Sequence, residues 1–311
     1  MLTIVTTPRP FHGHQAIIQR NAIQSWLALR PACEIILIGN DKGTATVAAE
    51  FGLQHRPDVD CSESGLPLMD SFLRIAQSSA TFDIIAWLSA DIILMADFLP
   101  AIQRITKPSF LIAGQRWDLD IQEEINFTEA DWETQLRARL ADSGKLHPPT
   151  SGDLLVFPRR LWHDIPPFVI GRCSHDNWLF YRARSLGVPV IDATQVVTIV
   201  HQNHDYPEDR DWDWKKPEAV KNPDYLKNLE LAGGYSHMFT LQDATHVLTP
   251  RGLVKPALTM DCLRRYFDTL PVLSPRLAFW ATCARRLLSF RSSVRAVMQR
   301  MRQFLSSDYR S

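Results

Sequence analysis

Ile84-Ile85-Ala86-Trp87-Leu88-Ser89-Ala90-Asp91 is the stretch that decides the fold. It belongs to the apolar run of residues 82–94, in which neighbouring positions are apolar together rather than in alternation. Such a run is typical of a central parallel strand, because helices cover both faces of a parallel sheet. We therefore expect a buried strand that delivers the carboxylate of Asp91 to the sheet edge where α/β proteins bind ligands.

The same alternation of short apolar runs and helical periodicity extends outward from this strand. Strands are expected at residues 2–6, 34–39, 53–56 and 109–114, and helices at 15–29, 44–51, 67–80 and 97–105. Further on, the expected helices are 127–140 and 177–186, and the expected strands are 153–157, 188–193 and 196–201, before a long loop over the site at 204–225. This order predicts an α/β fold with a mostly parallel central sheet flanked by helices.

The composition excludes several classes of protein. The 311 residues carry no net charge and are 45% hydrophobic, which favours a packed core over disorder and gives no reason to expect nucleic acid as a partner. The five cysteines are scattered and form no CxxC pair, so a disulfide framework or structural zinc is not expected. No signal-peptide pattern opens the sequence, and no uncharged apolar run reaches the ~18 residues of a membrane span. A soluble, cytoplasmic protein is the expectation.

Charge is distributed unevenly along the chain. Residues 251–311 hold twelve Lys and Arg against three Asp and Glu, and residues 275–306 carry an apolar stripe at helical spacing between seven arginines. We expect a first domain at 1–253 and a basic, amphipathic helical extension at 254–311. The extension either lies on an anionic membrane, making the protein peripheral at the inner face, or packs on the first domain or a second copy in a homodimer.

Two polar clusters follow apolar strands. Asp91 either caps a turn or binds a divalent metal. The run 201–206, His-Gln-Asn-His-Asp-Tyr, directly follows the apolar residues 196–200. It is either a solvated turn with a structural histidine or a source of imidazole and carboxylate ligands for a metal such as manganese.

A third candidate is Asp176, which lies at the start of the helix expected at 177–186. It either caps that helix, a task that Asn177 could also perform, or acts as a general base. Weaker candidates follow other strands. Thr6, Thr7 and Pro8 could meet a nucleoside or form only a turn, and Asp41 could meet a base or ribose or cap a helix. Phosphate or sugar hydroxyls would suit Gln115, Arg116 and Asp118.

As an ordered set, these segments resemble the GT-A glycosyltransferase fold, in particular a group of bacterial and eukaryotic proteins related to family 2 glycosyltransferases. The resemblance covers about residues 1–253. Ser89-Ala90-Asp91-Ile92 is similar to the Asn-Ala-Asp-Ile type motif that replaces the usual DxD there. Similar segments recur in the same order at 114–118, 166–172, 176–178 and 201–206.

The resemblance implies transfer of a sugar from a nucleotide-diphosphate sugar to a hydroxyl of a carbohydrate, lipid or protein acceptor, with Mn or Mg as cofactor. It implies that Asp91 and His201 bind the metal and that Asp176 is the base of an inverting reaction. The implied donor-binding residues are Thr6, Thr7, Pro8, Asp41, Ser89, Ala90, Gln115, Arg116, Asp118, Arg172 and Asn177. Two departures stand out: Ser89 replaces the first carboxylate of the metal motif, and His175 replaces an acidic residue before Asp176.

Two other functions compete with transfer. A degenerate GT-A domain could act as a binding module for nucleotide sugars or carbohydrates, since the metal motif is reduced. A sugar nucleotidyltransferase would also use a doubly wound sheet and a metal. It would normally carry a Gly-rich, basic loop after the first strand, where residues 6–14 supply only Arg9 and Gly13.

Overall fold

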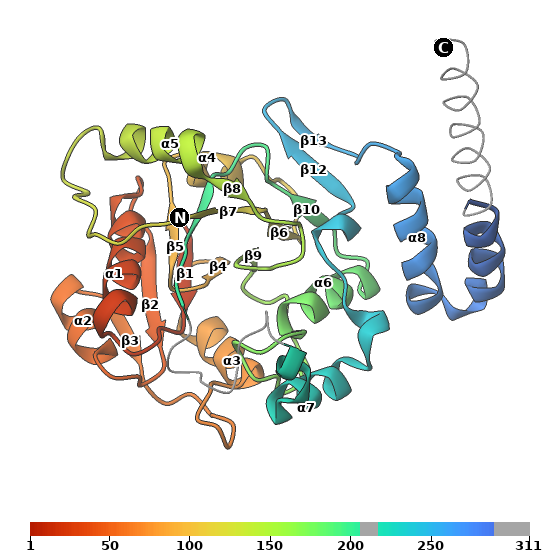
Figure 1. Ribbon diagram of the computed structural model, residues 1–311, viewed down its shortest axis with the longest axis horizontal. Coiled ribbons are helices and arrows are strands. Elements are labelled where there is room, and N and C mark those ends of the chain that lie inside the picture. The colour runs from red at the N-terminus through yellow and green to blue at the C-terminus, as the bar shows by residue number, and fades with distance from the viewer. Residues whose placement is uncertain (206–216, 289–311) are drawn as a thin grey trace, which may run out of the picture. The chain divides into compact units, whose positions relative to one another are not determined.

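The structure is a computed structural model that describes residues 1–205 and 217–288 (Figure 1). Its contacts divide the chain into two compact units, Met1–Pro256 and Ala257–Ser311.

The first unit is built on a nine-stranded sheet in the order β13-β12-β10-β6-β9-β4-β1-β2-β3. Most neighbouring pairs are parallel, while β9 runs antiparallel to β4 and β6, and β13 to β12. The strands are β1 Thr3–Thr6, β2 Glu34–Ile38, β3 Gln54–Arg56, β4 Ile84–Leu88, β6 Leu111–Ala113, β9 Leu154–Pro158, β10 Val190–Asp192, β12 His246–Thr249 and β13 Gly252–Val254. The predicted α/β fold with a mostly parallel sheet is confirmed.

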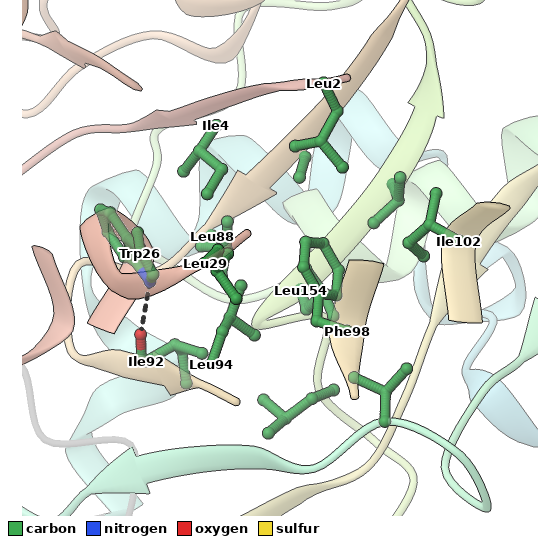
Figure 2. Close-up of a cluster of buried hydrophobic side chains, with 14 of the residues drawn as sticks. Leu2, Ile4, Trp26, Leu29, Leu88, Ile92, Leu94, Phe98, Ile102 and Leu154 are labelled. Atoms are coloured by element: carbon green, nitrogen blue, oxygen red, sulfur yellow. Dashed lines mark hydrogen bonds between the residues drawn. The ribbon is translucent and has the colours of Figure 1, made fainter. Parts of the chain in front are cut away.

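Helices cover both faces of this sheet, and β4 shows why its sequence is apolar at every position. Ala86 packs into the cluster that contains Trp26 of α1 (Gly13–Ala28) and Phe98 of α4 (Phe98–Gln103); part of this cluster is shown in Figure 2. The next residue, Trp87, points to the opposite face, where its ring centroid lies 4.8 Å from that of Phe72. Phe72 belongs to α3 (Met69–Ser79). A strand with apolar neighbours on both faces needs apolar side chains throughout.

A smaller sheet lies beside the large one, in the order β5-β11-β7-β8. Its strands are β5 Ile92–Leu94, β11 Ile199–Gln202, β7 Arg116–Leu119 and β8 Lys145–Leu146. One face of this sheet, with Ile93, Leu119 and Val200, packs against Leu136 and Leu140 of α5 (Trp132–Ser143).

The smaller sheet corrects the expectation of one strand at 82–94. The chain turns after Leu88, where the Ile92 N–H donates to the Ser89 carbonyl at 3.2 Å, and continues as β5 in the other sheet. Hydrophobicity hides this break because both strands are buried: Ile92 and Leu94 pack in the cluster of the large sheet and Ile93 in that of α5. Asp91 lies in the turn between the two sheets.

Other elements differ from the expectation in extent. The loop predicted at 204–225 is wrong for its last part, because Pro217–Lys221 is a 3-10 turn (η1) and α7 (Pro223–Ala232) begins there; residues 206–216 lie outside the described residues. Asn222 caps α7 by accepting from the N–H groups of Asp224 and Tyr225. The remaining elements of this unit are α2 Thr44–Phe51, α6 His175–Ser185, η2 Tyr235–His237 and η3 Leu241–Asp243.

The second unit contains α8 (Met260–Leu273), η4 (Pro275–Leu277) and a helical segment at residues 278–288. The rest of the stripe predicted at 275–306 lies outside the described residues. Within residues 1–205 and 217–288, no helix combines the length and the apolar character that crossing a membrane requires.

Candidate metal centre and adjoining cavity

The turn that carries Asp91 is held by hydrogen bonds to its backbone. The Ser89 N–H donates to the Asp153 carbonyl at 3.0 Å. The buried Gln202 side chain donates to the Asp91 carbonyl at 2.9 Å, and the Trp26 indole N–H donates to the Ile92 carbonyl at 2.9 Å (Figure 2). The carboxylate of Asp91 therefore stands on a backbone whose position is fixed on both sides.

Strand pairing brings His201 to this carboxylate. In β11, His201 pairs with Ile92 of β5, which directly follows Asp91, and with Asp118 of β7 on the other side. His204 comes three residues later. His201 and His204 lie 110 and 113 positions after Asp91 in the sequence, so only the sheet register brings them to it.

Asp91, His201 and His204 form a group with the geometry of a metal site. One ligand atom from each lies within 4.8 Å of the others. Asp91 Oδ2 is 2.9 Å from His204 Nε2 and 3.6 Å from His201 Nε2. Asp91 Oδ1 is buried and accepts no hydrogen bond from the described residues. Two imidazole nitrogens and a carboxylate with an unsatisfied buried oxygen fit a divalent ion such as Mn²⁺.

The electrostatics of the group favour an ionised carboxylate. Burial by itself raises the pKa of Asp91, but the adjacent imidazoles of His201 and His204 outweigh burial and hold this pKa well below its usual range. Burial also raises the pKa of Asp118, and here too the hydrogen bond from His147, the neighbouring His201 and the charge of Arg116 outweigh burial and lower this pKa far below the usual range. Metal ligation requires the deprotonated form, which Asp91 has at neutral pH.

A cavity of about 370 Å³ opens beside this group. Nine of the residues predicted from the sequence line it: Thr7, Ser89, Ala90, Asp91, Arg116, Arg172, Asp176, Asn177 and His201. A second cavity, which shares Arg116, His147, His201 and His204 with the first, is lined by Asp118. The first cavity therefore joins the metal group to Asp176 and to three arginines, Arg9, Arg116 and Arg172.

Four other predicted residues do not line these cavities. Thr6, Pro8, Asp41 and Gln115 are not among the residues that line either cavity. The Thr6 hydroxyl donates to the Leu88 carbonyl at 2.7 Å and so ties β1 to the end of β4. Gln115 Nε2 donates to the His147 carbonyl at 2.7 Å. Thr6 and Gln115 thus support the site through the backbone of Leu88 and His147, which line the first cavity.

Asp176 and Asn177 lie in the first turn of α6, and their side chains bind neighbouring loops. Asp176 Oδ2 accepts from the Gly152 N–H at 2.8 Å, and Asn177 Nδ2 donates to the carbonyls of Thr150 and Phe239. Neither side chain caps its own helix, whose N-cap is Ser174. A Cβ at Gly152 would lie 3.0 Å from Asp176 Cβ, so a larger residue here would have to shift Asp176 by a few tenths of an ångström.

Three site residues were not singled out from the sequence. His204 lies in the same polar run as His201, three residues later, and this spacing could have indicated a second histidine ligand. His147 and Asp153 follow no such pattern. His147 reaches the site because its Nδ1 lies 2.8 Å from Asp118 Oδ2, and Asp153 because its Oδ1 accepts from Arg116 at 2.7 Å.

Comparisons with known proteins give a limited result. No protein-family model matches the sequence, and no curated protein matches it either. Among solved structures, glucosyl-3-phosphoglycerate synthase from Mycobacterium tuberculosis, in complex with Mg²⁺ and uridine diphosphate, is 15% identical with a TM-score of 0.45, over 75% of this chain and 80% of that one. A mannosyltransferase from Pyrobaculum calidifontis, in complex with GDP-Man and Mn²⁺, is 14% identical with a TM-score of 0.42, over 94% of this chain and 79% of that one.

Proposed function

We propose that the protein is a glycosyltransferase of the GT-A type that moves a sugar from a nucleotide-diphosphate sugar to an acceptor hydroxyl, assisted by Mn²⁺ or Mg²⁺. The observation that carries the proposal is the group of Asp91, His201 and His204 at the end of β4, where a buried carboxylate oxygen has no partner among the described residues. This group adjoins a cavity with arginines and a further carboxylate.

Asp91, His201 and His204 would hold the ion, whose chemical contribution is to neutralise the charge that develops on the departing diphosphate. Arg116 and Arg172, which also line the cavity, would add positive charge for the phosphates or orient the sugar hydroxyls. Arg116 is itself fixed by Asp153, so its side chain is positioned before a ligand arrives.

Asp176 is proposed as the general base of an inverting reaction. It lines the same cavity as the metal group, and its Oδ2 is held by the Gly152 N–H, which fixes the orientation of the carboxylate. Its role would be to accept the proton of the acceptor hydroxyl as that oxygen attacks the anomeric carbon.

The test is ligand-dependent thermal stabilisation with UDP-, GDP-, CDP- and TDP-sugars, with and without Mn²⁺. At least one donor should raise the Tm of the wild type only when Mn²⁺ is present, since ligands that bind the native state stabilise it by mass action. Asp91→Ala should abolish this increment and the hydrolysis of the same donor. Asp142→Ala, which removes an exposed carboxylate from α5, is the control and should behave as the wild type.

Equal Mn²⁺-dependent stabilisation of Asp91→Ala and the wild type would contradict the proposal. The competing function is binding of nucleotide sugars or carbohydrates without transfer. The replacement of a motif carboxylate by Ser89 favours this alternative. Donor binding without transfer or hydrolysis in any acceptor mixture would support the module.

We also propose that the second unit contacts an anionic membrane surface. Phe279, Trp280 and Leu287 are each more than 60% exposed on the helical segment 278–288, next to exposed Arg285 and Arg286. Trp280 and Leu287 are seven residues apart, which places them on one side of the helix. An aromatic and aliphatic face with flanking arginines matches the chemistry of acidic lipid headgroups over acyl chains.

A further inference from the structure

We propose that Asp118 is a positioning residue that orients His201 toward the metal ion. The inference rests on the proposed metal site of Asp91, His201 and His204, and it assigns Asp118 a role different from the donor contact that the sequence suggests. The geometry that supports it comes from strand register, from the contacts of the carboxylate and from the two nitrogens of one imidazole ring.

Register places Asp118 and His201 side by side. They are partners across the parallel pair of β7 and β11. Trp117 and Leu119, the neighbours of Asp118 in β7, pack with the α5 cluster on the opposite face. Because strand side chains alternate between faces, Asp118 lies on the face that looks toward the site, together with Arg116 and His201.

The carboxylate of Asp118 is held by its protein partners. Its Oδ1 lies 2.9 Å from Arg116 Nε and 3.3 Å from His201 Nδ1, and its Oδ2 lies 2.8 Å from His147 Nδ1. Both oxygens thus face cationic or N–H groups of the chain. These contacts use three of the about four acceptor positions of a carboxylate, which disfavours a direct donor contact.

The His201 ring faces two carboxylates with its two nitrogens. Nδ1 lies 3.3 Å from Asp118 Oδ1 and has no well-directed hydrogen bond to the described residues, while Nε2 lies 3.6 Å from Asp91 Oδ2. A proton on Nδ1, facing the Asp118 carboxylate, leaves the lone pair on Nε2, the nitrogen on the side of Asp91. Ligating histidines commonly donate their second N–H to a carboxylate, which fixes tautomer and ring orientation.

The experiment measures Mn²⁺ affinity of the full chain by electron paramagnetic resonance, with no nucleotide or sugar present. Loss of an outer partner of a metal ligand typically weakens binding by roughly tenfold to hundredfold, and we expect this for Asp118→Asn. Asp83→Asn is the matched control. It makes the same substitution in an ion pair with an arginine, Arg159, at an exposed position that lines neither cavity, so its Mn²⁺ affinity should stay within about threefold of the wild type.

A second pair of variants tests whether Asp118 acts through His201. In the background of His201→Ala, which already weakens binding, Asp118→Asn should cause no further loss, because coupled residues are not additive. An equal loss in both backgrounds would overturn the proposal, and so would unchanged Mn²⁺ affinity of Asp118→Asn in the wild-type background.

The outcomes separate this inference from the proposed function. If the wild type binds Mn²⁺, Asp91→Ala does not, and Asp118→Asn binds like the wild type, the metal site stands and the role of Asp118 fails. If the wild type itself does not bind Mn²⁺, the proposed function fails first. Asp118→Ala, which leaves no side-chain acceptor for His201 Nδ1, should weaken Mn²⁺ binding at least as much as Asp118→Asn when the two are compared at matched thermal stability.

Discussion

Asp91 and Glu34, both in the first unit, keep their carboxylates ionised through different contacts. Asp91 relies on two imidazoles and leaves its buried Oδ1 without a partner among the described residues. Glu34 instead accepts hydrogen bonds from Thr3, Gln54 and both the N–H and the hydroxyl of Thr81. The unsatisfied oxygen of Asp91 is costly unless a ligand occupies it, whereas the contacts of Glu34 serve the fold.

Glu34 gives a prediction about pH. Burial raises the pKa of Glu34, but its hydrogen bonds outweigh burial and lower this pKa below its usual range. A carboxyl group with a depressed folded-state pKa stabilises the native state above its unfolded-state pKa of about 4.3, and this stabilisation is lost as pH falls through the folded-state value. Glu34→Gln should therefore be less stable than the wild type at pH 6, with a difference that shrinks toward pH 3.

The measurement is the free energy of unfolding by urea at a series of pH values. Glu63→Gln, on an exposed loop, controls for the change in net charge and should follow the wild-type curve. A constant difference between Glu34→Gln and the wild type from pH 6 to pH 3 would show that the ionised carboxylate is not the source of the stability.

At the level of elements, the position of the site depends on how α1 joins the two sheets. Gln202, at the end of β11, is fully buried and donates to the carbonyls of Ile18 in α1 and of Asp91. Its own oxygen accepts from Asn21 of α1 at 3.0 Å. One side chain thus links helix, strand and metal-site turn, and a buried network of this kind is stabilising only when every member is satisfied.

Gln202→Leu should destabilise the first unit by about 1–3 kcal/mol, because it leaves buried polar groups without their partner. It should also weaken Mn²⁺ binding, since the Asp91 turn loses one of its supports. Gln135→Leu, at an exposed position of α5, should change stability by less than about 0.5 kcal/mol. Chemical denaturation and Mn²⁺ titration of both variants provide the comparison, and equal stability of the two would contradict the role of the network.

At the scale of the whole molecule, the second unit is more basic than the first and carries exposed aromatic side chains. The second unit, residues 257–311, holds ten of the 34 basic residues but three of the 34 acidic ones. The exposed aromatic side chains Phe279 and Trp280 belong to this basic part. This membrane contact would hold the enzyme at the surface that contains a lipid-carried acceptor.

The membrane proposal predicts binding of the full chain to vesicles that contain phosphatidylglycerol and weaker binding to neutral phosphatidylcholine vesicles. Each basic residue near an anionic surface contributes about 1 kcal/mol, so replacing Arg285 and Arg286 by Gln should weaken binding roughly tenfold or more. Binding should also fall as salt rises. Trp280→Ser should also weaken vesicle binding. Tyr235→Ser, which removes an exposed aromatic from the first unit, is its control and should bind as the wild type does. Indifference to both lipid charge and the arginine substitutions would rule the membrane contact out.

Most of the fold could be predicted because it follows from local patterns. The apolar runs gave β1 and β2 within one residue and the start of β4 within two, and helical periodicity gave α1, α2 and α3. The break between β4 and β5 could not be predicted, since both strands are equally buried and only the pairing partners differ. For the same reason, β7 and β8 were missed: short strands are defined by the neighbours they bond to more than by their own composition.

The candidate site divides in the same way. By itself, the sequence determined the residue types and their order: a carboxylate after a buried strand, and histidines after another. Tertiary structure alone decided that Asp91, His201 and His204 meet, that Asp118 stands behind His201, and that Thr6 and Gln115 support the walls. Register across β5, β11 and β7 makes these choices, because a shift of one residue would turn His201 to the α5 face, and the partners of His201 in this register, Ile92 and Asp118, lie 109 and 83 residues away.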